Sequence, residues 1–125
     1  MSLQSLPRRK NVKSGIARAL RRVFPRHEKW VRGHVCCVPG CENREIEFMH
    51  LRSAANAGTG LKPASWFGVP GCRDQHAEAH RIGHDSFAVK YGIDLWVLAE
   101  TLARRSPDMA MREAMAHTGQ MAEVR

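Results

Sequence analysis

The chain has 125 residues, of which 43% are hydrophobic, and a formal net charge of +8. This length suits one modest domain, no apolar run is long enough to cross a bilayer, and the N-terminus has no signal-peptide core. We therefore expect a cytoplasmic protein without a membrane partner, whose four cysteines are thiols or metal ligands rather than disulfides.

The positive charge is concentrated near the N-terminus. Residues 1–33 carry ten Lys or Arg against one acid, a net of +9, whereas the rest of the chain carries ten basic and eleven acidic side chains, a net of −1. We interpret residues 1–26 as a basic arm, partly disordered or helical, in which Pro25 stops a helix that presents Arg18, Arg21 and Arg22. Such an arm favours contact with DNA, although a solubilising tail has the same charge pattern.

Residues 27–105 are expected to form the main domain, beginning with a helical turn over 27–32. A Pro39-Gly40 turn then separates Cys36 from Cys41. Thiolates brought together by such a turn provide half of a tetrahedral zinc site, and Cys72 is the natural third ligand. The alternative is that these are buried free cysteines, which behave as small hydrophobic residues.

The next segments predict two strands followed by a helix. Residues 45–52 alternate between two faces, residues 53–64 have the composition of a loop, and residues 66–69 predict a second strand. A Pro70-Gly71 turn leads into a helix that Asp74 caps and Gly83 ends. His76 and His80 lie four residues apart on one face of this helix, which is typical of a ligand pair for a divalent metal, although a solvated His-rich face has the same spacing.

Three further helices are expected. Asp85 or Ser86 starts one that runs to Tyr91, Asp94 caps another over 95–105, and Ser106-Pro107 starts the last over 109–117. Residues 106–125 are then a C-terminal helix and tail.

Several short motifs together resemble the HNH endonucleases, most of all their small phage- and prophage-encoded branch. The resemblance spans residues 30 to about 105 and leaves out the arm and the last helix. In order, the motifs are Cys36…Cys41, Phe48-Met49-His50-Leu51-Arg52, Gly58-Thr59-Gly60-Leu61-Lys62-Pro63 and Val69-Pro70-Gly71-Cys72-x3-His76-x3-His80-Arg81-x-Gly83. It implies an α+β fold with a ββα-metal centre, zinc-knuckle cysteines and flanking helices, in an enzyme that hydrolyses DNA in the bacterial host cell.

The resemblance also implies roles for individual residues. His50 is the general base, and His76 and His80 hold the catalytic Mg²⁺ or Mn²⁺, with Zn²⁺ as a further option. Histidine suits a base because its pKa lies near neutrality, and a cation stabilises the charge of the transition state. A structural Zn²⁺ is implied at Cys36, Cys41 and Cys72. DNA contacts are expected from Arg52, Lys62 and Arg81, in addition to the arm.

Three positions depart from the family pattern. Met49 stands where a metal-binding Asp or His often precedes the base, Gln75 stands where a Cys or His completes the zinc site, and Ser65 replaces an Asp. The zinc site is therefore either incomplete or completed by Cys37 or His76. If His76 goes to zinc, the catalytic metal must use His80 and His84.

Two other functions remain open from the sequence. One is a non-catalytic DNA-binding module with a single structural zinc on Cys36, Cys41, Cys72 and His76, which would have no need of His50. The other is a phage accessory protein that binds a host recombination or repair protein through its helical C-terminus.

Overall fold

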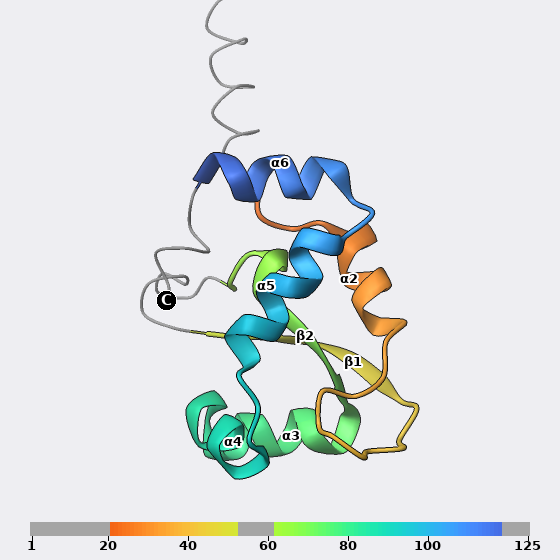
Figure 1. The fold of residues 1–125 in the computed structure, drawn as a ribbon, viewed down its shortest axis with the longest axis vertical. Helices are drawn as coiled ribbons and strands as arrows, with labels where there is room; N and C mark the ends of the chain where they lie inside the picture. The colour runs from red at the N-terminus through yellow and green to blue at the C-terminus, as the bar shows by residue number, and fades with distance from the viewer. Residues whose placement is uncertain (1–20, 53–61, 119–125) are drawn as a thin grey trace, which may run out of the picture.

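The computed structural model describes residues 21–52 and 62–118, so most of the predicted basic arm, including Arg18, lies outside the described residues. The described chain is α+β, with helices packed around a two-stranded antiparallel sheet (Figure 1). No helix within it is long and apolar enough to span a membrane. Its elements are α2 (Pro25–Arg32), β1 (Ile46–His50), η2 (Ser65–Phe67), β2 (Gly68–Cys72), α3 (Arg73–Ile82), α4 (His84–Tyr91), α5 (Leu95–Arg105) and α6 (Met109–Thr118).

The two strands form an antiparallel pair, and β2 leads directly into α3. β1 pairs with β2 so that Ile46 lies opposite Cys72 and His50 lies opposite Gly68. The strand predicted at 45–52 is confirmed in its core. The second strand is also confirmed, but its predicted bounds, 66–69, are wrong, because residues 65–67 form a 3₁₀ turn and β2 runs on to Cys72. Pro70, predicted in a turn, lies in β2 instead. It fits there because each strand of a two-stranded sheet has one unpaired edge, where a missing N–H costs nothing.

Both faces of the sheet are covered. On one face Phe48 packs with Val31 of α2 and Leu102 of α5. On the other face Met49 belongs to a cluster that joins the thiol-bearing loop, α3, α4 and α5. The other buried members of that cluster are Cys36, Val38, Leu51, Val69, Cys72, Ala79, Phe87, Leu95 and Ala99. α5 therefore serves both layers of the core, and Figure 1 shows it running past the sheet between α6 and α4.

Segments on both sides of the predicted main domain join its core. Phe24, upstream of it, is buried against Trp66, and its N–H donates to the Ser65 hydroxyl at 2.8 Å. Met111 and Met115 of α6 complete the same apolar cluster. Packing thus reaches upstream of residue 27 and downstream of residue 105.

Two helix starts differ from the sequence prediction near the sheet. Residues 21–24 are not helical and Pro25 begins α2, so Pro25 does not stop a helix that carries Arg21 and Arg22. Pro is well suited to a first turn because its missing N–H would have no partner there. At α3 the cap is Cys72, whose sulfur accepts from the Gln75 N–H, and not Asp74.

α5 and α6 begin at Leu95 and Met109, as predicted, but the predicted cap is confirmed at α5 only. The Asp94 carboxylate accepts from the Val97 N–H, which confirms this cap. α4 starts at His84 after Gly83 rather than at Asp85 or Ser86. At α6 the cap bond comes from Asp108, which accepts from the Met111 N–H at 3.0 Å, because Ser106 is buried and occupied by other partners.

Those partners form a buried polar contact between α2 and the start of α6. The Ser106 hydroxyl lies 2.8 Å from His27 Nδ1 and accepts from the Asp108 N–H at 3.1 Å. Among the described residues His27 Nε2 has no partner, and the ring is fully buried. Burial lowers the pKa of His27 to about 4, although the charges of Asp108 and Glu28 act in the opposite direction.

We expect His27 to make the fold sensitive to acid. Its pKa is lower in the folded than in the unfolded chain, so the unfolded chain binds the extra proton and stability falls as pH drops from 6.5 to about 4. The full loss corresponds to about 3 kcal/mol. Urea unfolding across this range, compared with His27→Asn, measures it, because Asn keeps a polar group near Ser106 but does not titrate. Equal pH slopes for the two proteins would contradict the assignment.

Candidate functional site

Three cysteine sulfurs form a compact group beside the sheet. The sulfurs of Cys36, Cys41 and Cys72 lie within 4.8 Å of one another, and those of Cys41 and Cys72 are 3.8 Å apart. A tetrahedral zinc with bonds of about 2.3 Å to sulfur separates its sulfurs by about 3.8 Å. The predicted gathering of these thiols is confirmed, and they could hold a metal such as zinc.

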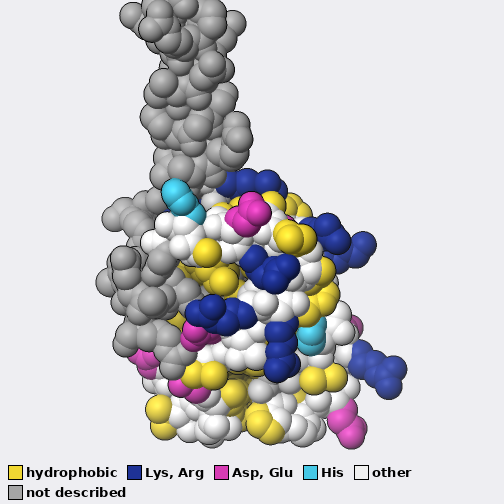
Figure 2. All heavy atoms as spheres, turned by 45° about the horizontal axis from the view of Figure 1, so that its top comes forward, with side chains coloured by type: hydrophobic (Ala, Val, Ile, Leu, Met, Phe, Trp, Pro, Cys, Tyr) yellow, Lys and Arg dark blue, Asp and Glu magenta, His cyan; other side chains and the backbone are white. Residues whose placement is uncertain are grey.

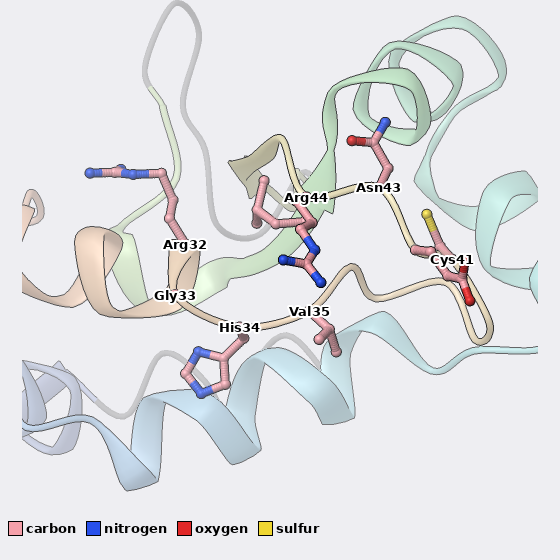
Figure 3. Close-up of a pocket in the computed structure, with 9 residues that line it drawn as sticks. Arg32, Gly33, His34, Val35, Cys41, Asn43 and Arg44 are labelled. Atoms are coloured by element: carbon pink, nitrogen blue, oxygen red, sulfur yellow. The ribbon is translucent and has the colours of Figure 1, made fainter.

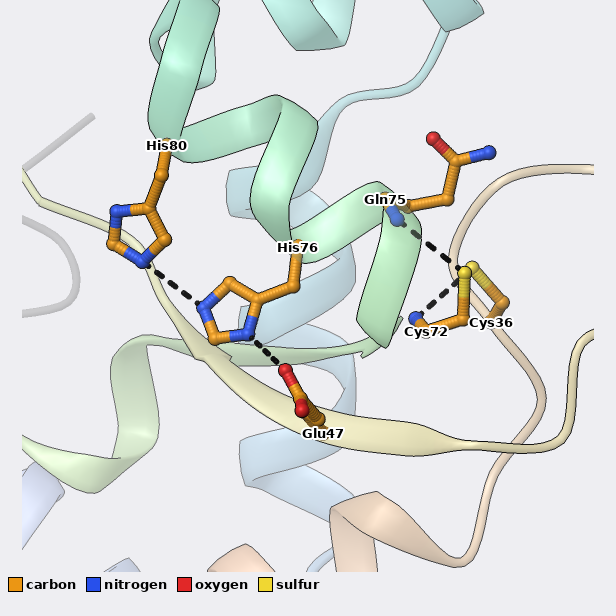
Figure 4. Close-up of polar contacts among 6 residues, drawn as sticks. All are labelled: Cys36, Glu47, Cys72, Gln75, His76 and His80. Carbon is orange, nitrogen blue, oxygen red and sulfur yellow. Dashed lines mark hydrogen bonds and ion pairs between the residues drawn. The ribbon is translucent and has the colours of Figure 1, made fainter.

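Local backbone structure brings the three thiols together. The turn at Val38–Cys41 closes with a hydrogen bond from the Cys41 N–H to the Val38 carbonyl, and Gly40 takes a φ of 81° that favours glycine. The Cys72 N–H points at the Cys36 sulfur, and the Gln75 N–H points at the Cys72 sulfur, each at 3.4 Å (Figure 4). Amide donors aimed at sulfur favour the thiolate form that a metal requires.

The thiols differ in how easily they ionise. Burial raises the pKa of Cys36, but hydrogen bonds from the N–H groups of Cys72 and Val38 outweigh burial and the net shift of this pKa is downward. Burial raises the pKa of Cys72 to about 11 and that of Cys37 to about 12. Of Cys36, Cys37 and Cys72, Cys36 is the one whose surroundings favour the thiolate.

A second polar group links β1 to the middle of α3. His76 Nδ1 lies 2.8 Å from a carboxylate oxygen of Glu47, and His76 Nε2 lies 3.1 Å from His80 Nε2 (Figure 4). The structure therefore confirms that His76 and His80 share a face, and it engages His76 away from the thiols. The carboxylate fixes the tautomer, with the proton on Nδ1, and leaves Nε2 turned toward His80.

Glu47 was missed by the sequence reasoning, which treated it as one polar residue of an alternating strand. The sequence feature that could have indicated Glu47 is its position two residues before Met49. This spacing puts both residues on one face of β1, the face that α3 covers. The side-chain reach of Glu47 to α3 is a tertiary property that spacing within β1 does not contain.

His50 stands at the end of β1 on the other face of the strand. Its ring packs edge-on against Phe48, with ring centroids 4.8 Å apart. Burial lowers the pKa of His50; the charge of Glu28 opposes this shift, and the charges of Lys62, Arg52 and His76 add to it. His50 is therefore neutral near pH 7, and no hydrogen bond joins it to His76 or His80 in the described structure.

His84 extends the row of imidazoles past the end of α3. Its ring centroid lies 6.4 Å from that of His80, and its Nδ1 accepts from the Arg52 N–H at 3.4 Å. Burial lowers the pKa of His84, and the neighbouring charges of His80 and His76 lower it further.

The predicted DNA-contacting residues are spread over several elements. The Arg21 guanidinium lies 4.3 Å from the centroid of the Phe24 ring, and Arg22 donates to the Lys62 carbonyl at 2.9 Å. Arg81 is exposed and lies 3.6 Å from Glu78. Lys and Arg side chains recur across the face shown in Figure 2, with apolar patches between them.

An open pocket of about 710 Å³ borders the segment that contains Cys41. Cys41, Val35 and Arg44 are among the residues that line it, and Figure 3 shows the Arg44 guanidinium extending toward the His34–Val35 segment. Val35 is 81% exposed. The pocket combines a positive charge with an apolar wall and borders one of the three thiols.

Comparison of the chain with protein-family models, curated proteins and solved structures finds no match.

Proposed function

We propose that this protein is a metal-dependent endonuclease of the HNH type that hydrolyses DNA phosphodiester bonds. The observation that carries the proposal is the row Glu47–His76–His80, beside a strand that ends in the neutral histidine His50. The sequence resemblance and the order β1, β2, α3 support the same reading, in which these elements are a ββα-metal centre. In this proposal His50 provides the base and the His76–His80 pair provides the cation-binding site, the two groups that phosphodiester hydrolysis requires.

The histidine pair suits a divalent cation. Ligand bonds of about 2.1 Å place two nitrogens about 3.0 Å apart at an octahedral angle and about 3.4 Å apart at a tetrahedral one. The separation of the Nε2 atoms of His76 and His80, 3.1 Å, falls in this range. When bound, the cation supplies stabilisation of the charged transition state. Glu47 orients His76, and His50 takes the proton of the attacking water at its unprotonated ring nitrogen.

We propose that the three thiols hold a separate, structural zinc. It would tie the loop before β1 to the junction of β2 and α3, and so fix the start of the helix that carries His76 and His80.

A plasmid-nicking assay with His80→Ala tests the nuclease. We expect the variant to lose nicking of supercoiled DNA in Mg²⁺ or Mn²⁺, because His76 alone is too weak a ligand to keep the cation in place. His117→Ala, an exposed histidine on α6, is the matched control and should nick like the wild type. Nicking by His80→Ala at the wild-type rate would overturn the proposed metal site.

The basic arm is proposed to provide sequence-independent DNA affinity. Deleting residues 1–20 removes five Lys or Arg but leaves the packed Phe24 in place. If all five contact phosphates, the slope of log K against log salt becomes less steep by about 4. Deleting residues 1–7, which contain no charged side chain, is the control. Equal slopes for the two deletions, measured on duplex DNA, would show that the arm does not bind.

A non-catalytic zinc-stabilised DNA-binding module is the second candidate. It is favoured by the thiol group, which is the one cluster of three or more close metal-ligand atoms in the described part of the chain. The module predicts DNA binding without nicking at any metal concentration, and one tightly held metal per chain.

A further inference from the structure

The thiol group leaves one corner of a metal tetrahedron without a protein ligand. All four cysteines and all seven histidines of the chain lie within the described residues, so each is accounted for. The group of close ligand atoms nevertheless contains three members, Cys36, Cys41 and Cys72. Structural zinc sites are almost always closed by four protein ligands, whereas three ligands and an open position are typical of reactive zinc.

Three neighbouring residues are candidates for a fourth ligand, and the side chains of two of them are directed elsewhere. Gln75 contributes its N–H to the Cys72 sulfur, and Figure 4 shows its side-chain amide directed away from the sulfurs. His76 is held by Glu47 and faces His80. Cys37 is the third candidate: its thiol interacts with that of Cys36 but lies outside the 4.8 Å group, and its N–H donates to the Pro70 carbonyl at 2.8 Å.

The thiol group is most accessible to solvent at Cys41. Cys36 and Cys72 are buried, but Cys41 is half-buried and borders the pocket into which Arg44 extends. The positive charge of Arg44 favours an anion there. A fourth thiolate would suit the same metals that three cysteine thiolates select.

We propose that Cys36, Cys41 and Cys72 form an open three-thiolate metal site whose fourth position is taken by a small, anionic thiol from solution. The exchange involves no oxidation: the incoming thiol releases its proton to solvent, its sulfur binds the metal, and a bound water leaves. This inference rests on the metal assignment made above, and it adds an exogenous ligand to that site.

Cobalt(II) in the full-length protein reports the number of thiolates, because each one strengthens the sulfur-to-metal absorption band. We expect mercaptoacetate to intensify the wild-type band in a saturable manner, and Arg44→Gln to raise the mercaptoacetate concentration needed. Gln75→Cys supplies a fourth thiolate; its band should be strong without mercaptoacetate and unchanged by it. Gln75→Cys should also slow zinc transfer to a coloured chelator by about tenfold, equal to about 1.4 kcal/mol.

Cys37→Ser decides between the open site and a closed site of four cysteines. The open site predicts a wild-type band and a wild-type response to mercaptoacetate in this variant. A wild-type band that ignores mercaptoacetate, or a Cys37→Ser protein that has lost the band, would overturn the open site and leave the structural metal intact. If no cobalt band appeared, both the open site and the structural metal site would be wrong. If nicking assays showed no nuclease activity, the predicted response of the thiol group to mercaptoacetate would be unaffected.

Discussion

Replacing His50 with alanine is expected to reduce plasmid nicking by about 10²–10⁴-fold, the usual contribution of general acid–base catalysis. His50 takes no part in the described hydrogen bonds of the thiol group or of the His76–His80 pair. The change should therefore leave metal content, thermal stability and DNA affinity close to those of the wild type. Single-turnover cleavage, metal analysis, calorimetry and filter binding on the same preparations measure the four quantities.

The pH profile of the wild type provides a second test of His50. A base must be unprotonated, so nicking should rise with pH through the pKa of His50. Burial lowers this pKa from its ordinary 6.5, so the rise should be centred below pH 6.5. His50→Ala should lose this limb of the profile. Equal rates for wild type and variant at pH 7.5, in the same metal and salt, would rule out the mechanism.

Removing the metal from the thiol group should cause the largest loss of stability. With Cys72→Ser, or with a strong chelator added to the wild type, we expect a loss on the order of 3 kcal/mol and a fall in melting temperature of roughly 10–20 °C. Cys72 is 1% exposed and belongs to the main core cluster, so its loss affects both packing and ligation. Differential scanning calorimetry with zinc analysis checks the expectation.

Cys37→Ser is the matched control for the thiol group. It replaces one sulfur by oxygen, as Cys72→Ser does, but Cys37 lies outside the close group of sulfurs. It should retain its zinc and lose much less stability than Cys72→Ser. If chelation leaves the wild-type melting temperature unchanged, the thiols are ordinary core residues and the proposed structural zinc is wrong.

The features that the sequence predicted best are those set by local spacing. The i, i+4 pair His76–His80, the Asp94 cap and the Pro39-Gly40 turn each involve residues within a few positions of one another, and the structure confirms all three. Cys72 is distant in the chain from the other thiols, yet the sequence assigned it to the same group. Few residue types bind zinc, so there were few candidates for a third ligand.

The features that the sequence did not predict are tertiary. β2 extends through Pro70 because Phe48 and Met49 of β1 need a partner strand, a demand that residues 66–72 do not reveal. A Cβ at Gly68 would lie 1.9 Å from the Phe48 ring, so this glycine permits the close approach of side chain and strand. Ser106 looked like a helix cap, yet its hydroxyl pairs with His27, which is 79 residues away in the chain.

Cys72 belongs to three structures at once: it ends β2 opposite Ile46, it caps α3, and it contributes to the thiol group. His76 follows it by four residues, about one turn of helix. If the Cys72 cap loosens, the first turn of α3 frays before the rest of the helix is disturbed. This first turn is the rigid link between the thiol group and the histidine row. Amide hydrogen exchange at the start of α3 therefore reads the occupancy of the thiols. The positions of His76 and His80 therefore depend on Cys72, which is not part of the histidine row.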